Sequence, residues 1–313
     1  MNMEKQHIIP IVFSFDDNLV MQAGVCISSL LFHAKASTYY SIFILHDDQA
    51  KFPKLGELEK LHEFYSNFEI SYVNVGETFK DAFQIRGITQ ATYYRLLIPD
   101  VIPQYDTIMY HDVDIIFRSD LADIFLNTAM EDYYVAGVST PFSDTEEYLQ
   151  KVIGMTSKEY IAAGNIILNS KKLREDGLVQ KFKDLAKENW KYQDMDVLNI
   201  ACKGRVKYLP PSFCVVGTTS KILQDPKQTY YSKEETAYAL KYGIIHYNGP
   251  KPWNSWCLNF DIWWEYYRKS PYFNAQYYYQ FYASKFNELD ELSLMKRVKV
   301  LVRYFFPRKR GKG

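Results

Sequence analysis

The sequence predicts an α/β protein built on a mostly parallel sheet flanked by helices. Segments rich in β-branched and aromatic residues alternate with segments in which apolar residues recur at helical spacing. Several of the strand segments are continuously apolar, which is typical of strands covered by helices on both faces. Acidic clusters follow three of them, in "FSFDDN", "LHDD" and "YHDVD". In parallel sheets, ligands bind at this edge, beyond the carboxyl ends of the strands.

The elements of the first 120 residues follow one another in a regular order. The segment 7–15, "HIIPIVFSF", is typical of a strand, and the helical segment 19–34 has Asn18 as its expected cap. The further expected elements are a strand at 39–45, a helix at 52–66, a strand at 68–75, a short helix at 92–103 ended by prolines, and a strand at 107–117.

The rest of the chain divides into three parts. Strands are expected at 133–138 and 165–169 and helices at 170–189 and 192–202, followed by a short strand before "HYNGPKPW". The aromatic-rich segment 257–286 predicts helices packed on the core. We therefore expect a main domain at 1–255, a helical extension at 256–293 and a basic, hydrophobic tail at 294–313.

The composition excludes general disorder, because 47% of the 313 residues are hydrophobic, with 27 Tyr, 20 Phe and 5 Trp. Such aromatic residues serve mainly in packing, and stacking platforms are the alternative. The net charge of zero hides an asymmetry: the tail carries eight basic residues and no acid. The remaining 29 basic residues, 37 minus 8, face all 37 acids, which leaves a net charge of −8. An acidic body argues against general nucleic-acid binding.

The tail needs its own explanation. Its mixture of cations with Leu, Val, Tyr and Phe suits adsorption to an anionic membrane surface, and a solvated, disordered end is the alternative. The four cysteines lie far apart, which fits a reducing cytosol rather than a disulfide framework or a zinc site. Neither a signal peptide nor a membrane-spanning stretch is recognised. We expect a cytoplasmic protein, with a peripheral position on the inner face of the plasma membrane as a further expectation.

An acid pair interrupts the apolar segment 107–117. Asp112 and Asp114 are alternate residues, so in a strand their carboxylates face one side and repel each other unless a cation lies beside them. Carboxylate oxygens suit Mg²⁺ or Mn²⁺, which keep positions open for phosphate oxygens. An ordinary turn with two solvated acids is the alternative. The apolar flanks favour the metal site, because burying acids there without a function is costly.

A second segment, "GIIHYNGPKPWNSW", places His246 before a turn that contains glycine and proline, with Lys251 five residues further on. A neutral imidazole can complete an oxygen-rich metal site, and an ammonium group can neutralise phosphate charge. A lone histidine is more often structural. The combination with the turn and the lysine favours the functional interpretation.

Six motifs occur in the order seen in glycosyltransferase family 8: "FSFDDN", "TYYRLLIP", "MYHDVDIIFRSDL", "AAGNIILNSKKLRE", "YQDMDVLNIACKGRVKYLP" and "IIHYNGPKPW". The chain resembles this family, which includes bacterial lipopolysaccharide and capsule galactosyl- and glucosyltransferases and glycogenin, over roughly residues 7 to 255. The resemblance implies the Rossmann-like nucleotide-sugar-binding fold called GT-A, Mn²⁺ or Mg²⁺, and a UDP-sugar donor such as UDP-glucose or UDP-galactose. It also implies transfer to a glycan or glycolipid acceptor with retention of the anomeric configuration.

The resemblance also implies roles for individual residues. Asp112 and Asp114 correspond to the metal-binding DxD pair, and His246 to the third metal ligand. The residues implied to contact the nucleotide and its diphosphate are Ser14, Asp16, Asn18, Val113, Gly249 and Lys251. The residues implied to hold or line the donor sugar are Arg95, Asp194, Ala163 and Gly164. From the residues alone, Arg95 has the alternative of a surface ion pair, and Asp194 that of a helix cap.

Three departures from the family pattern concern the sugar pocket. Ala162 stands where the family usually has Asn, and Met195 where it often has Gln. The turn between Gly249 and Lys251 is one residue shorter than the commonest form. Met195 excludes a double displacement through its side chain. We hypothesise instead that the acceptor hydroxyl attacks from the front face on an ion-pair-like state, and that the leaving phosphate takes the proton.

Two other functions compete with the transferase. The departures permit a degenerate or non-catalytic sugar-nucleotide-binding protein. A metal-dependent phosphatase or nucleotidyltransferase also uses an acid pair, but the threonine usual after "DxDG" is absent and "HYNGPKPW" has no role in it.

Overall fold

A central sheet organises the protein. The computed structural model describes residues 6–48, 52–83, 90–140 and 145–305. Within them lies a seven-stranded sheet of order β3-β2-β1-β4-β7-β6-β8. Its strands are β1 (His7–Ser14), β2 (Thr38–His46), β3 (Phe68–Asn74), β4 (Thr107–His111), β6 (Val135–Ser139), β7 (Ile161–Asn169) and β8 (Val206–Tyr208). Only β7 runs antiparallel to its neighbours in this sheet, which confirms the predicted mostly parallel α/β architecture.

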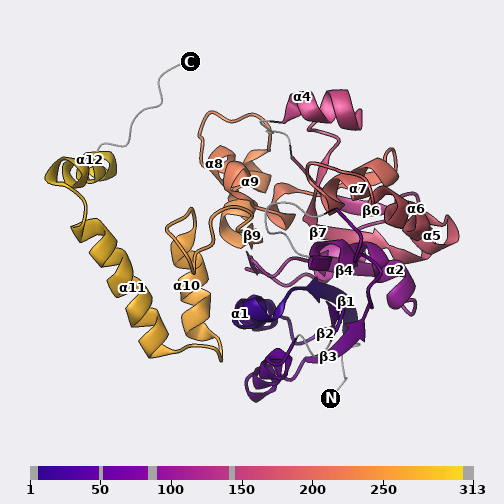
Figure 1. Ribbon diagram of the computed structural model, residues 1–313, viewed down its shortest axis with the longest axis horizontal. Helices are drawn as coiled ribbons and strands as arrows, with labels where there is room; N and C mark the ends of the chain where they lie inside the picture. The colour runs from indigo at the N-terminus through magenta and orange to yellow at the C-terminus, as the bar shows by residue number, and fades with distance from the viewer. Residues whose placement is uncertain (1–5, 49–51, 84–89, 141–144, 306–313) are drawn as a thin grey trace.

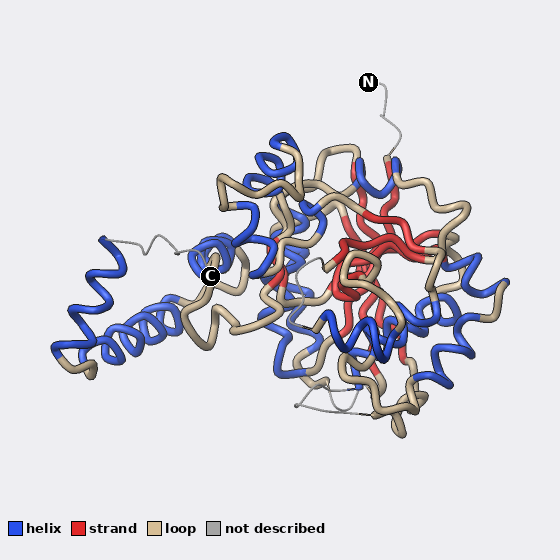
Figure 2. Tube along the Cα trace, turned by 90° about the horizontal axis from the view of Figure 1, so that it is seen from above, coloured by secondary structure: helices blue, strands red, loops and turns tan. Residues whose placement is uncertain are grey.

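Helices cover both faces of the sheet, as Figure 2 shows. The α-helices are α1 (Val20–Phe32), α2 (Ile98–Val101), α3 (Ala122–Asn127), α4 (Glu146–Tyr148), α5 (Ser170–Glu175), α6 (Leu178–Leu185), α7 (Asp194–Ala201), α8 (Gly217–Leu223), α9 (Lys233–Tyr242), α10 (Phe260–Lys269), α11 (Ala275–Asp290) and α12 (Leu294–Phe305). The 3-10 and π-helical segments are η1 (Asp17–Leu19), η3 (Leu55–Glu63), η4 (Gln90–Leu97), η5 (Leu149–Ile153) and η6 (Pro211–Phe213).

The sheet separates two hydrophobic cores. Ile11 and Phe13 of β1 belong to one core, whereas Val12 between them belongs to the other. Alternate residues of a strand point to opposite faces, so a strand between two cores must be apolar at every position. This explains why the first strand reads as a continuous apolar run rather than an alternating one.

The predicted strand 107–117 is wrong as a single element. β4 ends at His111, the chain turns through Asp112–Asp114, and β5 (Ile115–Ile116) then pairs with β9 (Ile245–His246) in a separate two-stranded sheet. Both aspartates are only partly buried, because at this turn their carboxylates point into the site rather than into a core. The acids therefore mark the point where the chain leaves the main sheet.

Other local differences have simple causes. The predicted helix 170–189 is divided into α5 and α6, because Gly177 adopts a left-handed φ of 68° between them. Asn18 does not cap α1; the carboxylate of Asp16 instead accepts a hydrogen bond from the backbone N–H of Asn18, at 3.0 Å, and starts the 3-10 turn η1. The helix expected at 52–66 forms as the 3-10 element η3.

The C-terminal segment packs on α1 through aromatic side chains. Trp263 and Trp264 of α10 are fully buried. The centre of the Trp264 ring lies 4.5 Å from the centre of the Phe281 ring in α11. The Tyr272 ring, between these helices, lies directly against Gly24 of α1. Figure 1 shows α11 and α12 at one side of the molecule, beyond α10.

The contact of Tyr272 with Gly24 predicts the effect of one added methyl group. In Gly24→Ala the new Cβ would lie 2.7 Å from Cε1 of the Tyr272 ring, so that the ring or helix α1 must move. We expect a loss of about 1–3 kcal/mol in the free energy of unfolding, measured by urea denaturation. Gly56→Ala is the matched control, since no atom lies within 4 Å of its new Cβ. Equal stability of the two variants would contradict this packing role.

Candidate active site

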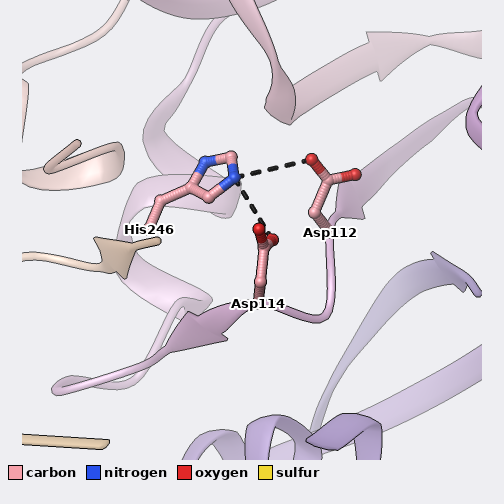
Figure 3. A group of neighbouring side chains, drawn as sticks. All are labelled: Asp112, Asp114 and His246. Carbon is pink, nitrogen blue, oxygen red and sulfur yellow. Dashed lines mark ion pairs between the residues drawn. The ribbon is translucent and has the colours of Figure 1, made fainter. Parts of the chain in front are cut away.

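Three potential metal ligands meet at one edge of the sheet. One ligand atom each from Asp112, Asp114 and His246 can be chosen so that all lie within 4.8 Å of one another. Nε2 of His246 lies 3.6 Å from Oδ2 of Asp112 and 3.3 Å from Oδ1 of Asp114. Figure 3 shows the imidazole nitrogen directed at both carboxylates. Oxygen atoms with one imidazole nitrogen form a donor set that suits Mn²⁺ or Mg²⁺.

The small sheet brings these residues together although they are far apart in the sequence. β5 follows Asp114 directly and pairs with β9 in the register Ile115–His246. The backbone N–H of Tyr247 donates to the carbonyl of Asp114 at 2.9 Å, and that of Asp112 donates to the carbonyl of Gly164 at 2.9 Å. The position of each carboxylate is therefore set by backbone hydrogen bonds on both sides of the turn.

Gly164 makes room for this arrangement. A Cβ at this position would lie 2.5 Å from Cε1 of His246 and would overlap the carboxylate of Asp112. A residue with a side chain would therefore displace Asp112 or His246. The sequence interpretation assigned Gly164 to the donor-sugar lining through its backbone; its contact with the acid–imidazole cluster was not foreseen.

Two of these groups, His246 and Asp114, shift each other's pKa. Burial lowers the pKa of His246, but the carboxylate of Asp114 and the sulfur of Cys214 outweigh this effect and raise it to about 10. For Asp114, burial raises the pKa, whereas His246 and Lys251 lower it well below its ordinary value. In the metal-free protein the imidazole is thus protonated at neutral pH. A divalent cation that uses Nε2 must displace this proton, so its binding releases a proton to solvent.

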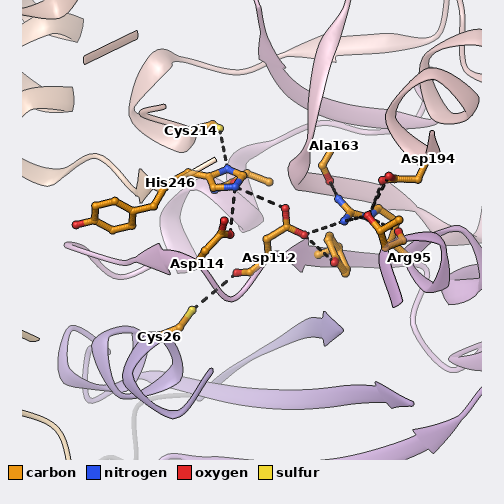
Figure 4. Close-up of polar contacts among 12 residues, drawn as sticks. Cys26, Arg95, Asp112, Asp114, Ala163, Asp194, Cys214 and His246 are labelled. Carbon is orange, nitrogen blue, oxygen red and sulfur yellow. Dashed lines mark hydrogen bonds and ion pairs between the residues drawn. The ribbon is translucent and has the colours of Figure 1, made fainter. Parts of the chain in front are cut away.

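Arg95 connects this cluster to a second acidic group. Its Nη2 lies 2.8 Å from Oδ1 of Asp112, its Nε lies 3.1 Å from Oδ2 of Asp194, and its Nη1 donates to the carbonyl of Ala163 at 2.6 Å. Figure 4 shows the guanidinium between the two carboxylates. Only 5% of the side chain is exposed, which rules out the alternative of a surface ion pair.

Asp194 is a buried carboxylate that shares the guanidinium of Arg95 with Asp112. It accepts a hydrogen bond from the hydroxyl of Thr92 at 2.9 Å and pairs with Arg95. Burial is the main cause that raises the pKa of Asp194 to about 6; Arg95 opposes the rise and Asp112 adds to it. The helix-cap alternative is not observed, because Gln193 occupies the cap position and α7 begins at Asp194 itself.

One family model matches most of the chain. The model of the family described as "Glycosyl transferase family 8" matches residues 10–257. The chain belongs to glycosyltransferase family 8. This confirms the resemblance indicated by the six motifs, and it leaves no support for a phosphatase or nucleotidyltransferase.

Relatives and solved structures agree with the family. The chain is 25% identical over 276 residues to the lipopolysaccharide 1,2-glucosyltransferase of Escherichia coli K12, an alignment that covers 82% of this chain and 76% of that protein. It is 31% identical over 186 residues to a putative glycosyltransferase of Haemophilus influenzae, covering 56% of this chain and only 52% of the relative. The crystal structure of the galactosyltransferase LgtC in complex with donor and acceptor sugar analogues has a TM-score of 0.69, with 24% identity over 86% of this chain and 99% of that one. The protein thus has the GT-A fold of such transferases.

The remaining implied site residues of this family 8 chain lie on elements around the cluster. Ser14 ends β1, the neighbour of β4 in the sheet, and its hydroxyl donates to the carbonyl of Ala91 at 2.7 Å. Asp16 caps the following turn η1, and Asn18 lies within this turn. Lys251 hydrogen-bonds to Asp114 and, at 2.6 Å, to the carbonyl of Tyr247. The others are Val113, which is buried, Gly249, which is exposed, Ala162 and Ala163 at the start of β7, and Met195 in α7. Their roles toward a donor stay predictions.

Sequence reasoning missed three side chains that hold the site. The Tyr110 hydroxyl donates to Oδ1 of Asp112 at 2.8 Å, and the Arg95 guanidinium lies 4.3 Å from the centre of the Tyr110 ring. Thr92 accepts from Arg95 and donates to Asp194. Cys214 contacts His246. In the sequence, Tyr110 lies two residues before Asp112 and Thr92 lies three residues before Arg95, and these spacings were the available signals. No sequence feature indicated Cys214.

The raised pKa of Asp194 predicts a pH-dependent effect of Asp194→Asn. The pKa is about 6 in the folded protein against an ordinary value of 3.8, so the stability due to the protonated carboxyl is complete below pH 3.8 and lost as the pH rises through about 6. An amide cannot ionise. The free energy of unfolding of the variant should therefore rise relative to the native protein between about pH 4 and pH 7, by up to about 1.4 kcal/mol per pKa unit.

Urea denaturation of the native protein and Asp194→Asn, at about pH 4 and pH 7 with chelator present, measures this difference in the free energy of unfolding. Asp132→Asn is the control, because Asp132 is an exposed acid in the turn before β6. A difference between native protein and Asp194→Asn that does not change with pH would refute the prediction.

Proposed function

We propose that the protein is a metal-dependent, retaining glycosyltransferase that moves a hexose, glucose or galactose, from a UDP-sugar to a glycan or lipid-linked acceptor in cell-surface polysaccharide biosynthesis. The observation that carries the proposal is the cluster of Asp112, Asp114 and His246 at the sheet edge, with Arg95 and Asp194 beside it. The names of the E. coli relative and of LgtC support the hexose and the surface-glycan acceptor.

The residues present fit a bound Mn²⁺ or Mg²⁺. Two carboxylates and one imidazole converge without a side chain at Gly164 to obstruct them, and they offer hard oxygen ligands with one nitrogen. When bound, the ion would offset the charge of the diphosphate during cleavage of the sugar–phosphate bond. Lys251, whose ammonium group already lies at Asp114, would add a second positive charge for the leaving diphosphate.

The residues around the donor sugar would position it rather than react with it. Asp194 is fixed by Thr92 and Arg95, which suits the orientation of sugar hydroxyls. Met195 offers no nucleophilic oxygen, so front-face attack by the acceptor hydroxyl is the mechanism that we propose. The leaving phosphate takes the hydroxyl proton, which balances the step without a basic side chain.

A non-catalytic sugar-nucleotide-binding protein is the other candidate, because Ala162 and Met195 differ from the family pattern. The comparisons do not favour it, since the E. coli relative and LgtC bear the names of transferases. Mass spectrometry after incubation with Mn²⁺ and a panel of UDP-sugars separates the two candidates. Glycoside formation or UDP release supports the transferase, and tight binding without turnover supports the alternative.

Removal of the metal ligands should abolish the metal-dependent part of nucleotide binding. We expect Asp112→Asn and Asp114→Asn to lower turnover by about 10²-fold or more, because charge on the leaving diphosphate is then less well balanced. Calorimetry should show that chelation weakens UDP binding by the native protein and has no further effect on the two variants.

The control for these variants is Asp106→Asn, at the other end of β4, where the acid is exposed and pairs only loosely with Lys171, at 3.9 Å. Unchanged UDP affinity after chelation of the native protein, or in both ligand variants, would overturn the metal site.

We further propose that the C-terminal tail attaches the enzyme to an anionic membrane surface. In α12, Leu294, Met295, Val298 and Val302 are exposed and recur at helical spacing. Lys296, Arg297 and Lys299 are also exposed on this helix. No helix among the described residues is long and apolar enough to cross a bilayer. An amphipathic, basic helix of this kind suits a position in the plane of the interface.

Sedimentation with anionic vesicles tests this attachment. Deletion of 294–313 should reduce binding strongly, because each basic residue near the surface contributes about 1 kcal/mol. Substituting Lys296 and Lys299 with Gln should weaken binding, whereas the same substitutions at Lys233 and Lys241, two exposed lysines of α9, should not. Equal binding by the full and shortened chains would contradict the proposal.

A further inference from the structure

The far side of the His246 ring faces a cysteine. Nδ1 of His246 lies 3.7 Å from Sγ of Cys214, while Nε2 faces the two aspartates. Both residues are buried. Figure 4 shows the sulfur and the carboxylates on opposite sides of the imidazole. Among the described residues, the sulfur of Cys214 is the hydrogen-bond partner of Nδ1. Neither the DxD motif nor the "HYNGPKPW" turn contains this cysteine.

The backbone fixes the cysteine in this position. Val215, the next residue, forms a parallel bridge with Ile245. The N–H of Val215 donates to the carbonyl of Ile244 at 2.8 Å, and the N–H of His246 donates to the carbonyl of Val215 at 3.1 Å. Cys214 and His246 are thus held by two strand-like segments bonded to each other. This backbone pairing places the two side chains next to each other.

The chemistry of a ligand histidine gives this contact a role. An imidazole that binds a metal through Nε2 carries its proton on Nδ1, and the partner of that N–H sets the tautomer and the orientation of the ring. In many sites this partner is a carboxylate, a backbone carbonyl or water. Sulfur accepts hydrogen bonds more weakly, but its larger radius allows contact at this distance.

We propose that Cys214 is a positioning residue of the metal centre: its sulfur accepts the Nδ1–H of His246 and thereby aims Nε2 at Asp112 and Asp114. The inference rests on the proposed metal-dependent function. It concerns the partner of the third ligand rather than the ligands themselves.

A purely structural role for Cys214 is the competing explanation, since a buried cysteine often acts only as a small apolar side chain. Cys202 provides a matched comparison. It is also buried and free, it lies at the C-terminal end of α7, and it packs in the hydrophobic core on the other face of the sheet from the one to which Cys214 belongs. Substitution of either cysteine with Ala removes one sulfur atom from a packed interior, but only Cys214→Ala removes the partner of His246.

The test combines metal affinity with the tautomer of His246. Calorimetry gives the Mn²⁺ dissociation constant of the native protein, Cys214→Ala and Cys202→Ala. Nitrogen-15 NMR of the Mg²⁺-loaded proteins shows which ring nitrogen of His246 carries the proton. We expect Mn²⁺ binding by Cys214→Ala to be about 10- to 100-fold weaker, with loss of the single Nδ1–H form, while Cys202→Ala behaves as the native protein does.

Three results would overturn the inference. Native Mn²⁺ affinity and an unchanged Nδ1–H signal in Cys214→Ala would make the contact incidental. A proton on Nε2 in the native Mg²⁺-loaded protein would do the same, and this measurement needs no substitution. No Mn²⁺ binding by the native protein would remove the metal centre itself, and with it the proposed function, a result distinct from equal binding by all three proteins.

Discussion

The convergence of two carboxylates on one buried imidazole is the interaction on which the site depends. Two acids this close are unfavourable without a positive charge, and three groups supply it in the protein: His246, Lys251 and Arg95. The cluster needs Gly164 for space and the pairing of β5 with β9 for position. The surrounding fold therefore holds the two carboxylates close together and supplies the positive charges that offset their repulsion.

The hydrogen bonds and ion pairs that stabilise these carboxylates also affect the protonation of Asp114 and Asp194. A buried charge is tolerated when it is paired and hydrogen-bonded, and each carboxylate here has at least two partners. His246 and Lys251 hold the pKa of Asp114 below its ordinary value, and burial raises the pKa of Asp194 to about 6. A site with perturbed protonation at the carboxyl ends of parallel strands is typical of an enzyme rather than of a structural ion-pair network.

The sequence was informative where chemistry is local and uninformative where it is not. Alternating apolar strands and helices predicted the α/β sheet, and the family motifs led to Asp112, Asp114, His246, Arg95 and Asp194. The apolar residues on both sides of the acid pair suggested one strand, because no local signal shows that the second half pairs with β9, about 130 residues further on. Likewise, Cys214 approaches His246 only because the segment at Val215 pairs with β9, which lies about 30 residues further along the chain.

Arg95 has a consequence for how two ligands would influence each other. One guanidinium group is divided between Asp112 and Asp194. A cation that engages Asp112 leaves more of the guanidinium charge to Asp194 and so favours its ionised form. Thermodynamic linkage makes this effect mutual, so a sugar that binds the Asp194 carboxylate would in turn raise the affinity for the cation. If the proposed cation and donor sugar bind at these two carboxylates, the shared Arg95 would therefore couple their binding.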